Sequence, residues 1–369
     1  MRIAVLSDTH LGHRRFYAES FAQLESSLKT ALAHNPDIII HPGDMFDNTS
    51  PSLDSLNRAY SIFSKFSNSG VPIYAIAGNH EKLPRDMANP VEFLGATGCF
   101  NYLHNTCKLV GEVAFVGMNY LPEDKAKDAL ELIIEREKDA LSSAKKRVLV
   151  IHQNIKDYAP GEGLTKKWLN SLPFDLILNG HIHKRIYEWP IILPGSTLTT
   201  KINEEEVLPR GITVIDLASS SVEFKEIEQK PFFYKVLEFD DGKEEEIREA
   251  ILSLYSSIKG EKPDAIIKIK LKGSTASEKT YISLPRMKDL YVDNDLVYKK
   301  LEKAVEEWKA SLSEKKDIIE ASNEELVKEL SKKMENAEEF LSMLYTMEAE
   351  DIVKELLREE QVNKEVAAK

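Results

Sequence analysis

The stretch that decides the fold is residues 2–10, RIAVLSDTH, in which an apolar run is followed by the polar residues Asp8 and His10. An uninterrupted apolar run of this length predicts a buried strand. Residues 16–35 have apolar positions at helical spacing and predict an amphipathic helix, and residues 37–41 predict a second buried strand. Strands that alternate with helices in this way indicate stacked β-α units and an α/β fold.

The alternation continues through the first 230 residues. We predict further helices over residues 51–69 and 126–144, further strands over residues 71–77, 147–152 and 174–179, and a strand-rich segment over residues 185–229 that completes a second sheet. Several strands end in a polar residue, and these residues are Asp8, Asp44, Asn79, His152 and His181. Because ligand sites of α/β folds lie outside the carboxyl ends of strands, we expect these side chains to share one site.

A domain boundary is predicted at Lys230-Pro231, because a new β-α-β pattern begins there. It consists of a strand over residues 232–239, a helix over 244–258, a strand over 265–271 and a short return strand over 290–292. Only helical pattern follows, including a capping box at residues 322–325. The predicted domains are residues 1–230, a small α+β domain over residues 231–295 and a helical segment over residues 296–369.

The length and composition indicate a multidomain globular protein. A chain of 369 residues is too long for one ordinary core, and 42% apolar with 30% charged residues is typical of a soluble protein. No apolar run reaches the roughly 18 to 20 residues that span a bilayer, and the start of the chain does not resemble a signal or transit peptide. We therefore expect a cytoplasmic protein whose two cysteines, Cys99 and Cys107, are structural thiols.

The net charge of −12 argues against nonspecific affinity for nucleic acid, which depends on Lys and Arg side chains that neutralise phosphates. The distribution of the charge weakens this argument. Residues 296–369 carry 13 basic and 19 acidic side chains and so contribute half of the excess. The rest of the chain is nearly balanced, and bound divalent cations would make a working cleft more positive.

Five short motifs carry the candidate chemistry, and they are Asp8-Thr9-His10, Gly43-Asp44, Gly78-Asn79-His80-Glu81, His152-Gln153-Asn154 and Gly180-His181-Ile182-His183. Each motif alone occurs by chance in many chains, but their order and their position at strand ends indicate one site.

Hydrolysis of a phosphodiester needs a hydroxide at neutral pH and compensation of negative charge in the transition state. Two divalent ions roughly 3.5 to 4 Å apart provide both. With two aspartates, such a site keeps two positive charges, which match one hydroxide and one phosphodiester anion.

These motifs resemble the signature of the calcineurin-like metallophosphatases. The resemblance implies a four-layer α/β/β/α sandwich that holds two divalent metal ions. It implies these ligands, with Asp44 shared by both ions: Asp8, His10 and His183 for one ion, and Asn79, His152 and His181 for the other. It also implies that His80 stabilises the transition state or protonates the leaving oxygen. The alternative for His80 is a hydrogen-bonded structural histidine.

Three motifs within residues 1–230 are similar to those of the SbcD-type nucleases, namely Asp8-Thr9-His10-Leu11-Gly12, His152-Gln153-Asn154 and Pro194-Gly195-Ser196. This resemblance implies a DNA exonuclease and endonuclease that processes double-strand breaks at the nucleoid, together with an SMC-like coiled-coil ATPase. It favours manganese, although histidine, carboxylate and amide ligands also suit iron or zinc. It implies a homodimer through helices around residues 51–69 and 86–95.

One residue departs from the family pattern. The third residue after the shared aspartate is commonly a histidine associated with handling DNA, whereas here it is Asp47. Because a carboxylate repels a phosphate, we hypothesise that Asp47→His raises exonuclease activity more than endonuclease activity. The alternative is that Asp47 orients His80 or faces water.

Two features beyond residue 230 have two interpretations each. Lys268, Lys270 and Lys272 alternate with apolar residues and so share one strand face, which is either a solvated surface or a contact for the DNA backbone. The resemblance favours a capping domain that contacts DNA.

The helical segment has an apolar stripe that either packs on the capping domain or binds the ATPase partner that the resemblance implies. This stripe includes Met334, Phe340, Met343, Leu344 and Met347.

Two alternatives to the nuclease stay open. The first is another calcineurin-like phosphodiesterase or phosphatase that acts on nucleotides. A phosphoprotein phosphatase is disfavoured, because residues 45–47 lack the arginine that such enzymes usually place there. The second is a non-catalytic scaffold with this fold, although every ligand position is filled here. Metal analysis separates a scaffold from an enzyme, since a scaffold should hold far fewer metal ions.

Overall fold

The computed structural model describes residues 1–84, 87, 89–204, 207–277, 282–287 and 289–299. The chain divides into two compact units, Met1–Lys230 and Pro231–Lys369, and each unit is described by itself. The helical segment predicted over residues 296–369 lies almost entirely outside the described residues. Among the helices that are described, none combines the length and the apolar composition that a membrane crossing requires.

The first unit contains a six-stranded sheet that begins with the opening strand of the chain. The strand order is β12-β11-β1-β2-β3-β4, in which β1 to β4 are parallel and β11 and β12 run antiparallel to their neighbours. The strands are β1 (Arg2–Val5), β2 (Ile38–Pro42), β3 (Ile73–Ile76), β4 (Asn101–Tyr102), β11 (Gly211–Asp216) and β12 (Ser221–Glu226).

A second six-stranded sheet packs against the first in the same unit. Its order is β5-β6-β7-β8-β10-β9, with parallel pairing from β6 through β8 to β10 and antiparallel strands at both edges. The strands are β5 (Thr106–Val110), β6 (Val113–Gly117), β7 (Lys146–Ile151), β8 (Leu176–Asn179), β9 (Ile186–Glu188) and β10 (Ile191–Leu193).

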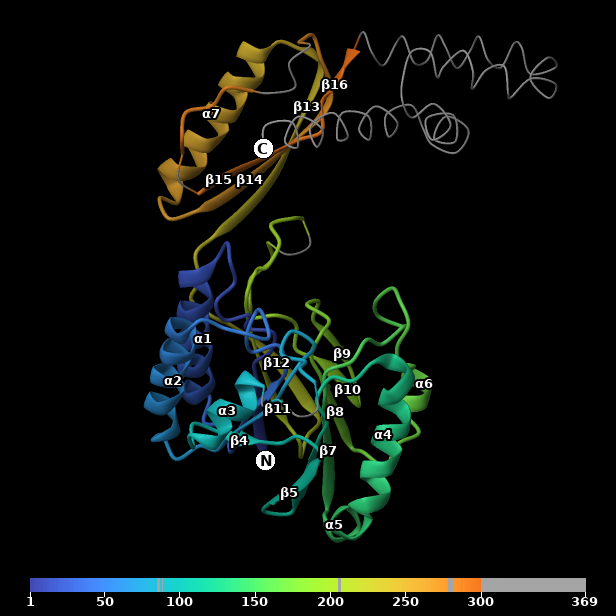
Figure 1. Cartoon of the computed structure of the whole chain (residues 1–369). Helices are drawn as coiled ribbons and strands as arrows, with labels where there is room; N and C mark the ends of the chain where they lie inside the picture. Colours follow the sequence, from blue (N-terminus) through green and yellow to red (C-terminus); the bar gives the residue numbers. More distant parts are fainter. Residues whose placement is uncertain (85–86, 88, 205–206, 278–281, 288, 300–369) are drawn as a thin grey trace, which may run out of the picture. The chain divides into compact units, whose positions relative to one another are not determined.

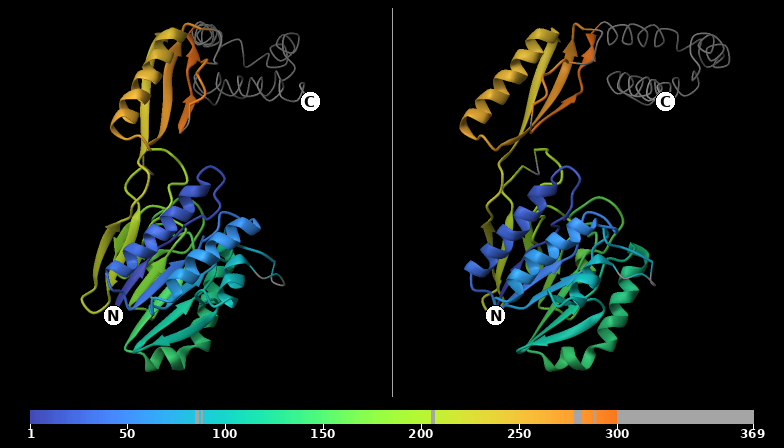
Figure 2. Two further views of the ribbon diagram at one scale, coloured as in Figure 1. Left: turned by 90° about the vertical axis from the view of Figure 1, so that its left-hand side faces the viewer. Right: turned by 60° about the vertical axis from the view of Figure 1, so that its left-hand side comes forward.

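Helices cover the outer face of each sheet, which confirms the predicted α/β/β/α sandwich (Figures 1 and 2). The first sheet is covered by α1 (Tyr17–Ala33), α2 (Leu53–Ser67) and α3 (Pro90–Ala96), and the second by α4 (Glu123–Arg136), α5 (Lys138–Ser143) and α6 (Lys166–Leu169). Strand β1 shows why the layers form. Ile3 and Val5 pack between the sheets, whereas Ala4 and Leu6 pack under the helices, so a strand buried on both faces must be apolar throughout.

The structure corrects three details of the predicted elements. The helix predicted over residues 126–144 is two helices, because the chain bends at Glu137 between α4 and α5. Helix α2 begins after Ser52, whose hydroxyl accepts a hydrogen bond from the backbone N–H of Ser55, and not at Pro51. The strand-rich segment completes both sheets, because β9 and β10 join the second sheet while β11 and β12 extend the first.

Within its described residues, which end at residue 299, the second unit contains one helix and a small parallel sheet. Helix α7 (Glu244–Glu261) buries Ile247, Ile251 and Ile258 against the sheet. The strands are β13 (Phe232–Gly242), β14 (Ile266–Thr275), β15 (Leu290–Asn294) and β16 (Val297–Tyr298), and β14 pairs in parallel with the other three. The return strand predicted over residues 290–292 is therefore parallel to its neighbour.

The layer between the two sheets yields a stability prediction. Phe115 on β6 is fully buried there, so Phe115→Ala removes a large apolar side chain and leaves a cavity. We expect a loss of about 3–5 kcal/mol in the free energy of unfolding, measured by urea denaturation. Leu109→Ala on the neighbouring β5 is the control, because this side chain is 54% exposed and its removal should cost no more than about 0.5 kcal/mol. Equal losses in both variants would contradict the assigned core.

Candidate metal centre

The predicted ligands lie at the carboxyl ends of strands from both sheets. Asp8 follows β1, Asp44 follows β2 and Asn79 follows β3 in the first sheet. His152 follows β7 and His181 follows β8 in the second sheet. Since the two sheets pack face to face through their inner residues, the structure brings side chains from five strands to one edge of the sandwich.

One half of the centre consists of Asp8, His10 and His183. The Nε2 atoms of His10 and His183 are 3.2 Å apart, and His183 Nε2 is 3.9 Å from Asp8 Oδ1. The three side chains place ligand atoms within 4.8 Å of one another. Two imidazole nitrogens that face each other at this distance need a proton or a cation between them.

The other half consists of Asn79, His152 and His181, with Asp44. The Oδ1 atom of Asn79 lies 2.8 Å from His181 Nδ1 and 3.1 Å from His152 Nε2. Asp44 Oδ2 is 3.2 Å from His152 Nε2. Asp44 also belongs to a group with His10 and His80 whose ligand atoms lie within 4.8 Å, so its carboxylate stands between the two halves.

The donor chemistry of this cluster fits two divalent cations. The Nδ1–H of His152 donates to the carbonyl oxygen of Pro42 at 2.8 Å, so a neutral His152 presents an unprotonated Nε2 to the site. Imidazole nitrogens, carboxylates and an amide oxygen are the ligand types that first-row divalent metals accept. Seven such side chains in one cluster therefore suit the two ions that this fold implies, with Asp44 placed to serve both.

The protonation states of the histidines depend on burial and on Asp44. Burial lowers the pKa of His181 to about 4, which keeps its imidazole neutral, the form that binds metal. Burial also lowers the pKa of His152, but the adjacent Asp44 carboxylate outweighs it and raises this pKa to about 9. The negative charge that attracts a proton to His152 is the same charge that attracts a cation.

The backbone of the centre is strained at the ligands themselves. Four of them have positive φ angles, and these are Asp8 at 51°, His10 at 42°, Asp44 at 51° and His181 at 72°. This region is sparsely populated by residues other than glycine. Such strain is found at functional sites when the surrounding structure holds it in place.

Two glycines explain part of the motif pattern. A Cβ atom at Gly78 would lie 2.1 Å from Asp44 Oδ1, and one at Gly180 would lie 2.3 Å from the carbonyl oxygen of Pro42. Both distances are far shorter than real contacts, so a side chain at either position would push the ligand loops apart. The glycine that precedes Asn79 and the one that precedes His181 are therefore needed for close packing of these loops.

His80 faces the centre from the third strand end. Its Nδ1 donates to the backbone carbonyl of Asp47 at 2.7 Å, and its Nε2 lies 4.0 Å from Asp44 Oδ2. The side chain is 38% exposed, in contrast to the buried His10 and His152. The structure therefore places His80 beside the cluster with part of its side chain exposed.

Glu81 and Ser196 belong to two of the sequence motifs, but the motifs alone predict no role for either residue. Glu81 is fully buried and accepts hydrogen bonds from the backbone N–H groups of Phe46 and Gly78, so it ties two ligand loops together. Burial and the nearby Asp44 raise the pKa of Glu81 to about 8 despite these bonds. Ser196 donates to the carbonyl oxygen of Asp8 at 2.7 Å.

The three lysines of β14 are not part of this centre. They belong to the second unit, and they share one face of the strand as predicted, while Ile267, Ile269 and Leu271 are buried on the other. Lys268 pairs with Asp293 at 2.6 Å and Lys270 with Asp295 at 2.8 Å. Part of their positive charge is therefore neutralised within the protein, which sequence alternation alone did not indicate.

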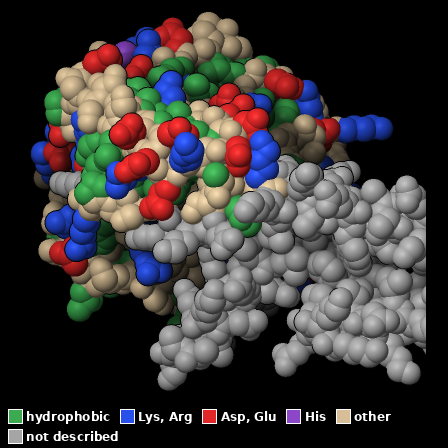
Figure 3. All heavy atoms as spheres, turned by 90° about the horizontal axis from the view of Figure 1, so that it is seen from above, with side chains coloured by type: hydrophobic (Ala, Val, Ile, Leu, Met, Phe, Trp, Pro, Cys, Tyr) green, Lys and Arg blue, Asp and Glu red, His purple; other side chains and the backbone are tan. Residues whose placement is uncertain are grey.

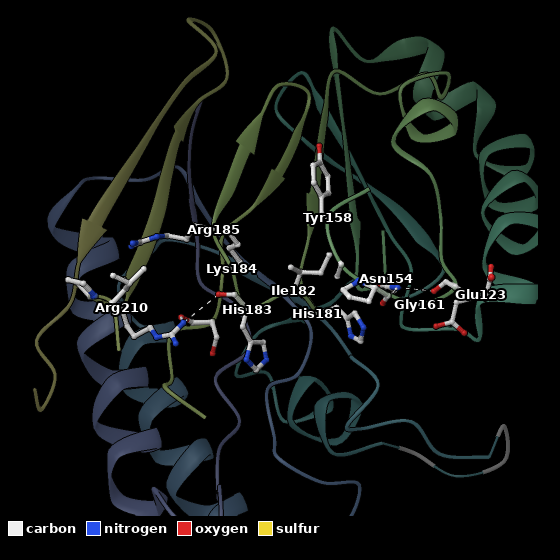
Figure 4. Close-up of a pocket in the computed structure, with 17 residues that line it drawn as sticks. Glu123, Asn154, Tyr158, Gly161, His181, Ile182, His183, Lys184, Arg185 and Arg210 are labelled. Carbon is white, nitrogen blue, oxygen red and sulfur yellow. Dashed lines mark hydrogen bonds between the residues drawn. The ribbon is translucent and has the colours of Figure 1, made fainter. Parts of the chain in front are cut away.

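A cavity of about 1130 Å³ adjoins the metal centre (Figure 4). His181 and His183 line it, and Figure 4 shows their imidazoles directed to the same side, whereas Tyr158 is directed to the opposite side. The guanidinium of Arg210 donates to the carbonyl oxygen of His183 at 3.4 Å and so supports the backbone of this ligand. The cavity gives a substrate access to one flank of the cluster.

Comparison with known proteins identifies relatives of this chain. A DNA double-strand break repair protein Mre11 from Methanosarcina acetivorans is 28% identical over 75% of this chain, but the match covers 46% of that protein. The Mre11 protein of Sulfolobus acidocaldarius is 26% identical over 81% of this chain and 82% of its own length. The chain thus spans about half the length of the first relative. Among solved structures, TT1561 of Thermus thermophilus has a TM-score of 0.45 and 12% identity, covering 62% of this chain and 99% of that one.

The family assignment depends on the part of the chain that forms the centre. Residues 1–185 match the sequence profile of the calcineurin-like phosphoesterases. This match spans half of the chain and includes β1 to β8 and all seven predicted ligands, from Asp8 to His183. Together with the α/β/β/α layers and the clustered ligands, it shows that this chain belongs to the calcineurin-like phosphoesterase family.

Proposed function

We propose that this protein is a two-metal phosphodiesterase that acts as a DNA exonuclease and endonuclease in the processing of double-strand breaks. The observation that carries the proposal is the convergence of seven ligand side chains, with His10 and His183 nitrogens 3.2 Å apart and Asn79 between His152 and His181. The similarity to archaeal Mre11 proteins supports DNA as the substrate. The resemblance to SbcD-type nucleases supports manganese as the metal.

The chemistry of the centre is divided between the metal ions and the side chains. Two divalent ions would neutralise the phosphate charge and acidify a water molecule. Asp8, His10 and His183 would hold one ion, Asn79, His152 and His181 the other, and Asp44 would contact both. The chain itself contributes four buried ligands, Asp8, His10, Asp44 and His152, around which electrostatic interactions are stronger than in water.

His80 is the residue we assign to the leaving group. Its Nδ1–H bond to the Asp47 carbonyl holds the ring in one orientation and directs Nε2 toward the cluster. A protonated Nε2 there donates to the leaving oxygen or to the charge that develops on the phosphate, which are the usual roles of a histidine general acid. A structural histidine would not need its second nitrogen exposed beside the ligands.

The remaining parts of the proposal concern location, partners and assembly. We propose that the second unit contacts DNA through Lys268, Lys270 and Lys272, that the segment after residue 296 binds an SMC-like ATPase, and that the protein is a nucleoid-associated homodimer. On the face shown in Figure 3, basic and acidic side chains of the described residues are interspersed. We expect DNA affinity to depend on individual lysines, of which Lys272 is exposed at the end of the row Lys268, Lys270 and Lys272.

A nucleotide phosphodiesterase is the second candidate function. The cavity beside His181 and His183 has a volume of about 1130 Å³, which is large enough for a nucleotide. Asn154 and Arg185 also line it and offer polar contacts. Under this alternative, the protein would prefer nucleotides or cyclic nucleotides to DNA.

The proposed function predicts metal-dependent cleavage of DNA. The full chain should cleave linear, hairpin and circular DNA with Mn²⁺, and dialysis against a chelator should abolish this activity until Mn²⁺ is restored. Cyclic nucleotides and phosphopeptides serve as competing substrates in the same assay. A protein that hydrolyses cyclic nucleotides but leaves all three DNA forms intact would support the second candidate.

A pair of histidine substitutions separates metal binding from turnover. His80→Ala should keep both ions and lose roughly 10²–10⁴-fold in kcat, as expected for loss of a general acid. His152→Ala should lose one ion as well as activity, because it removes a ligand. Metal content by mass spectrometry and kcat on a model diester measure the two effects, with His34→Ala at the end of α1 as the control. Loss of metal in His80→Ala would place His80 among the ligands.

The lysine row predicts unequal contributions to DNA binding. Lys272→Ala should weaken DNA affinity and reduce the dependence of affinity on salt by about one phosphate contact. Lys268→Ala should have a smaller effect, because Lys268 is already paired with Asp293. Affinity measured over a series of salt concentrations distinguishes the two variants. Identical salt dependence in both variants and in the unaltered protein would exclude this strand as a DNA contact.

A further inference from the structure

Asp47 contacts two histidines of the centre through different groups. Its side-chain Oδ1 lies 3.4 Å from Nδ1 of His10, and its backbone carbonyl accepts the hydrogen bond from Nδ1 of His80. The rings of His10 and His80 are themselves in edge contact, with centroids 4.7 Å apart. Asp47 therefore lies at the Nδ1 side of both a predicted metal ligand and the predicted leaving-group histidine.

Backbone hydrogen bonds hold Asp47 in this place. The N–H of Asp47 donates to the carbonyl of Leu11 at 3.1 Å, and the N–H of Leu11 donates to the carbonyl of Met45 at 2.8 Å. These bonds join the loop that carries His10 to the loop that carries Asp44. The position of Asp47 relative to His10 thus follows from the fold and does not depend on its own side chain.

The environment of His10 shows what the Asp47 carboxylate supplies. The Nδ1 atom of His10 is buried and makes no hydrogen bond of good geometry, while Asp47 Oδ1 is within ion-pair distance of it. The opposite nitrogen, Nε2, faces His183. A proton on Nδ1 would therefore be stabilised by the carboxylate, and Nε2 would be free to donate its lone pair to a cation. Carboxylates placed behind ligand histidines in this way orient the ring and raise its basicity.

We propose that Asp47 is a positioning residue that holds the metal-ligand tautomer of His10 and so sets the affinity of the Asp8, His10 and His183 half of the centre for its ion. The inference rests on the proposed metal pair and is independent of the proposed DNA substrate. It gives the Asp47 side chain a partner inside the protein. This role belongs to the Asp47 carboxylate, because the hydrogen bond from His80 is accepted by the Asp47 backbone carbonyl.

The test is titration of the chelator-treated full chain with Mn²⁺, followed by isothermal calorimetry. Asp47→Asn keeps the size of the side chain and removes its charge. We expect the affinity of one of the two ions to fall by roughly 10- to 100-fold, as for other residues behind metal ligands, and that of the other ion to change little. With bis(p-nitrophenyl) phosphate as substrate, the Mn²⁺ concentration for half-maximal activity should rise while kcat at saturating Mn²⁺ stays within about twofold, because His80 keeps its backbone partner.

Three controls keep the result specific. Asp54→Asn removes a carboxylate of the same segment that is 63% exposed, and it should leave both affinities unchanged. Asp47→Ser tests the same loss with a smaller side chain, and unchanged thermal melting of the metal-free variants excludes a folding defect. In a His10→Ala background, Asp47→Asn should have no further effect on the remaining ion.

Two outcomes would overturn the proposal. One is an unchanged Mn²⁺ affinity in Asp47→Asn. The other is an equal loss in the presence and absence of the His10 imidazole, which would indicate a general effect of charge. Failure of the unaltered protein to bind two ions would instead refute the metal pair, and normal Mn²⁺ binding without DNA cleavage would refute only the nuclease.

Discussion

The constraint on which the first unit depends is the crowding of lone-pair donors at one edge of the sandwich. Buried polar atoms that face each other without protons between them repel, and each has also lost its contact with water. The Nε2 atoms of His10 and His183 meet in this way. Divalent cations would satisfy these nitrogens together with the carboxylate and amide oxygens of the cluster. The donor set of the cluster therefore favours cation binding.

The fold maintains this crowding through a layer of hydrogen bonds behind the ligands. Glu81 joins the second and third strand ends, Ser196 holds the backbone of Asp8, and the carbonyl of Pro42 holds His152. Except for the local bond between Glu81 and Gly78, these bonds link chain segments that are distant in sequence. The ligands are consequently fixed relative to one another by the protein before any ion binds, which limits the reorganisation that metal binding requires.

The second unit shows a different balance of charge. Its sheet exposes a row of lysines, but acidic residues on and just after the adjacent strand neutralise two of them. Surface ion pairs of this kind contribute little to stability and can open when a phosphate competes for the lysine. The proposed DNA contact would therefore compete with the protein's own carboxylates for these lysines.

The sequence by itself determined the α/β class and the β-α order of the first unit, and it predicted the side chains that the structure brings together in the candidate centre. These features are local, since each apolar run and the polar residue at its end are neighbours in the chain. Only the tertiary structure decided that β11 and β12 extend the first sheet, that Glu81 bonds to the loop of Phe46, that Asp47 lies beside His10, and that Lys268 and Lys270 are paired. These contacts join residues far apart in the chain, and they depend on how whole sheets pack, which no local pattern encodes.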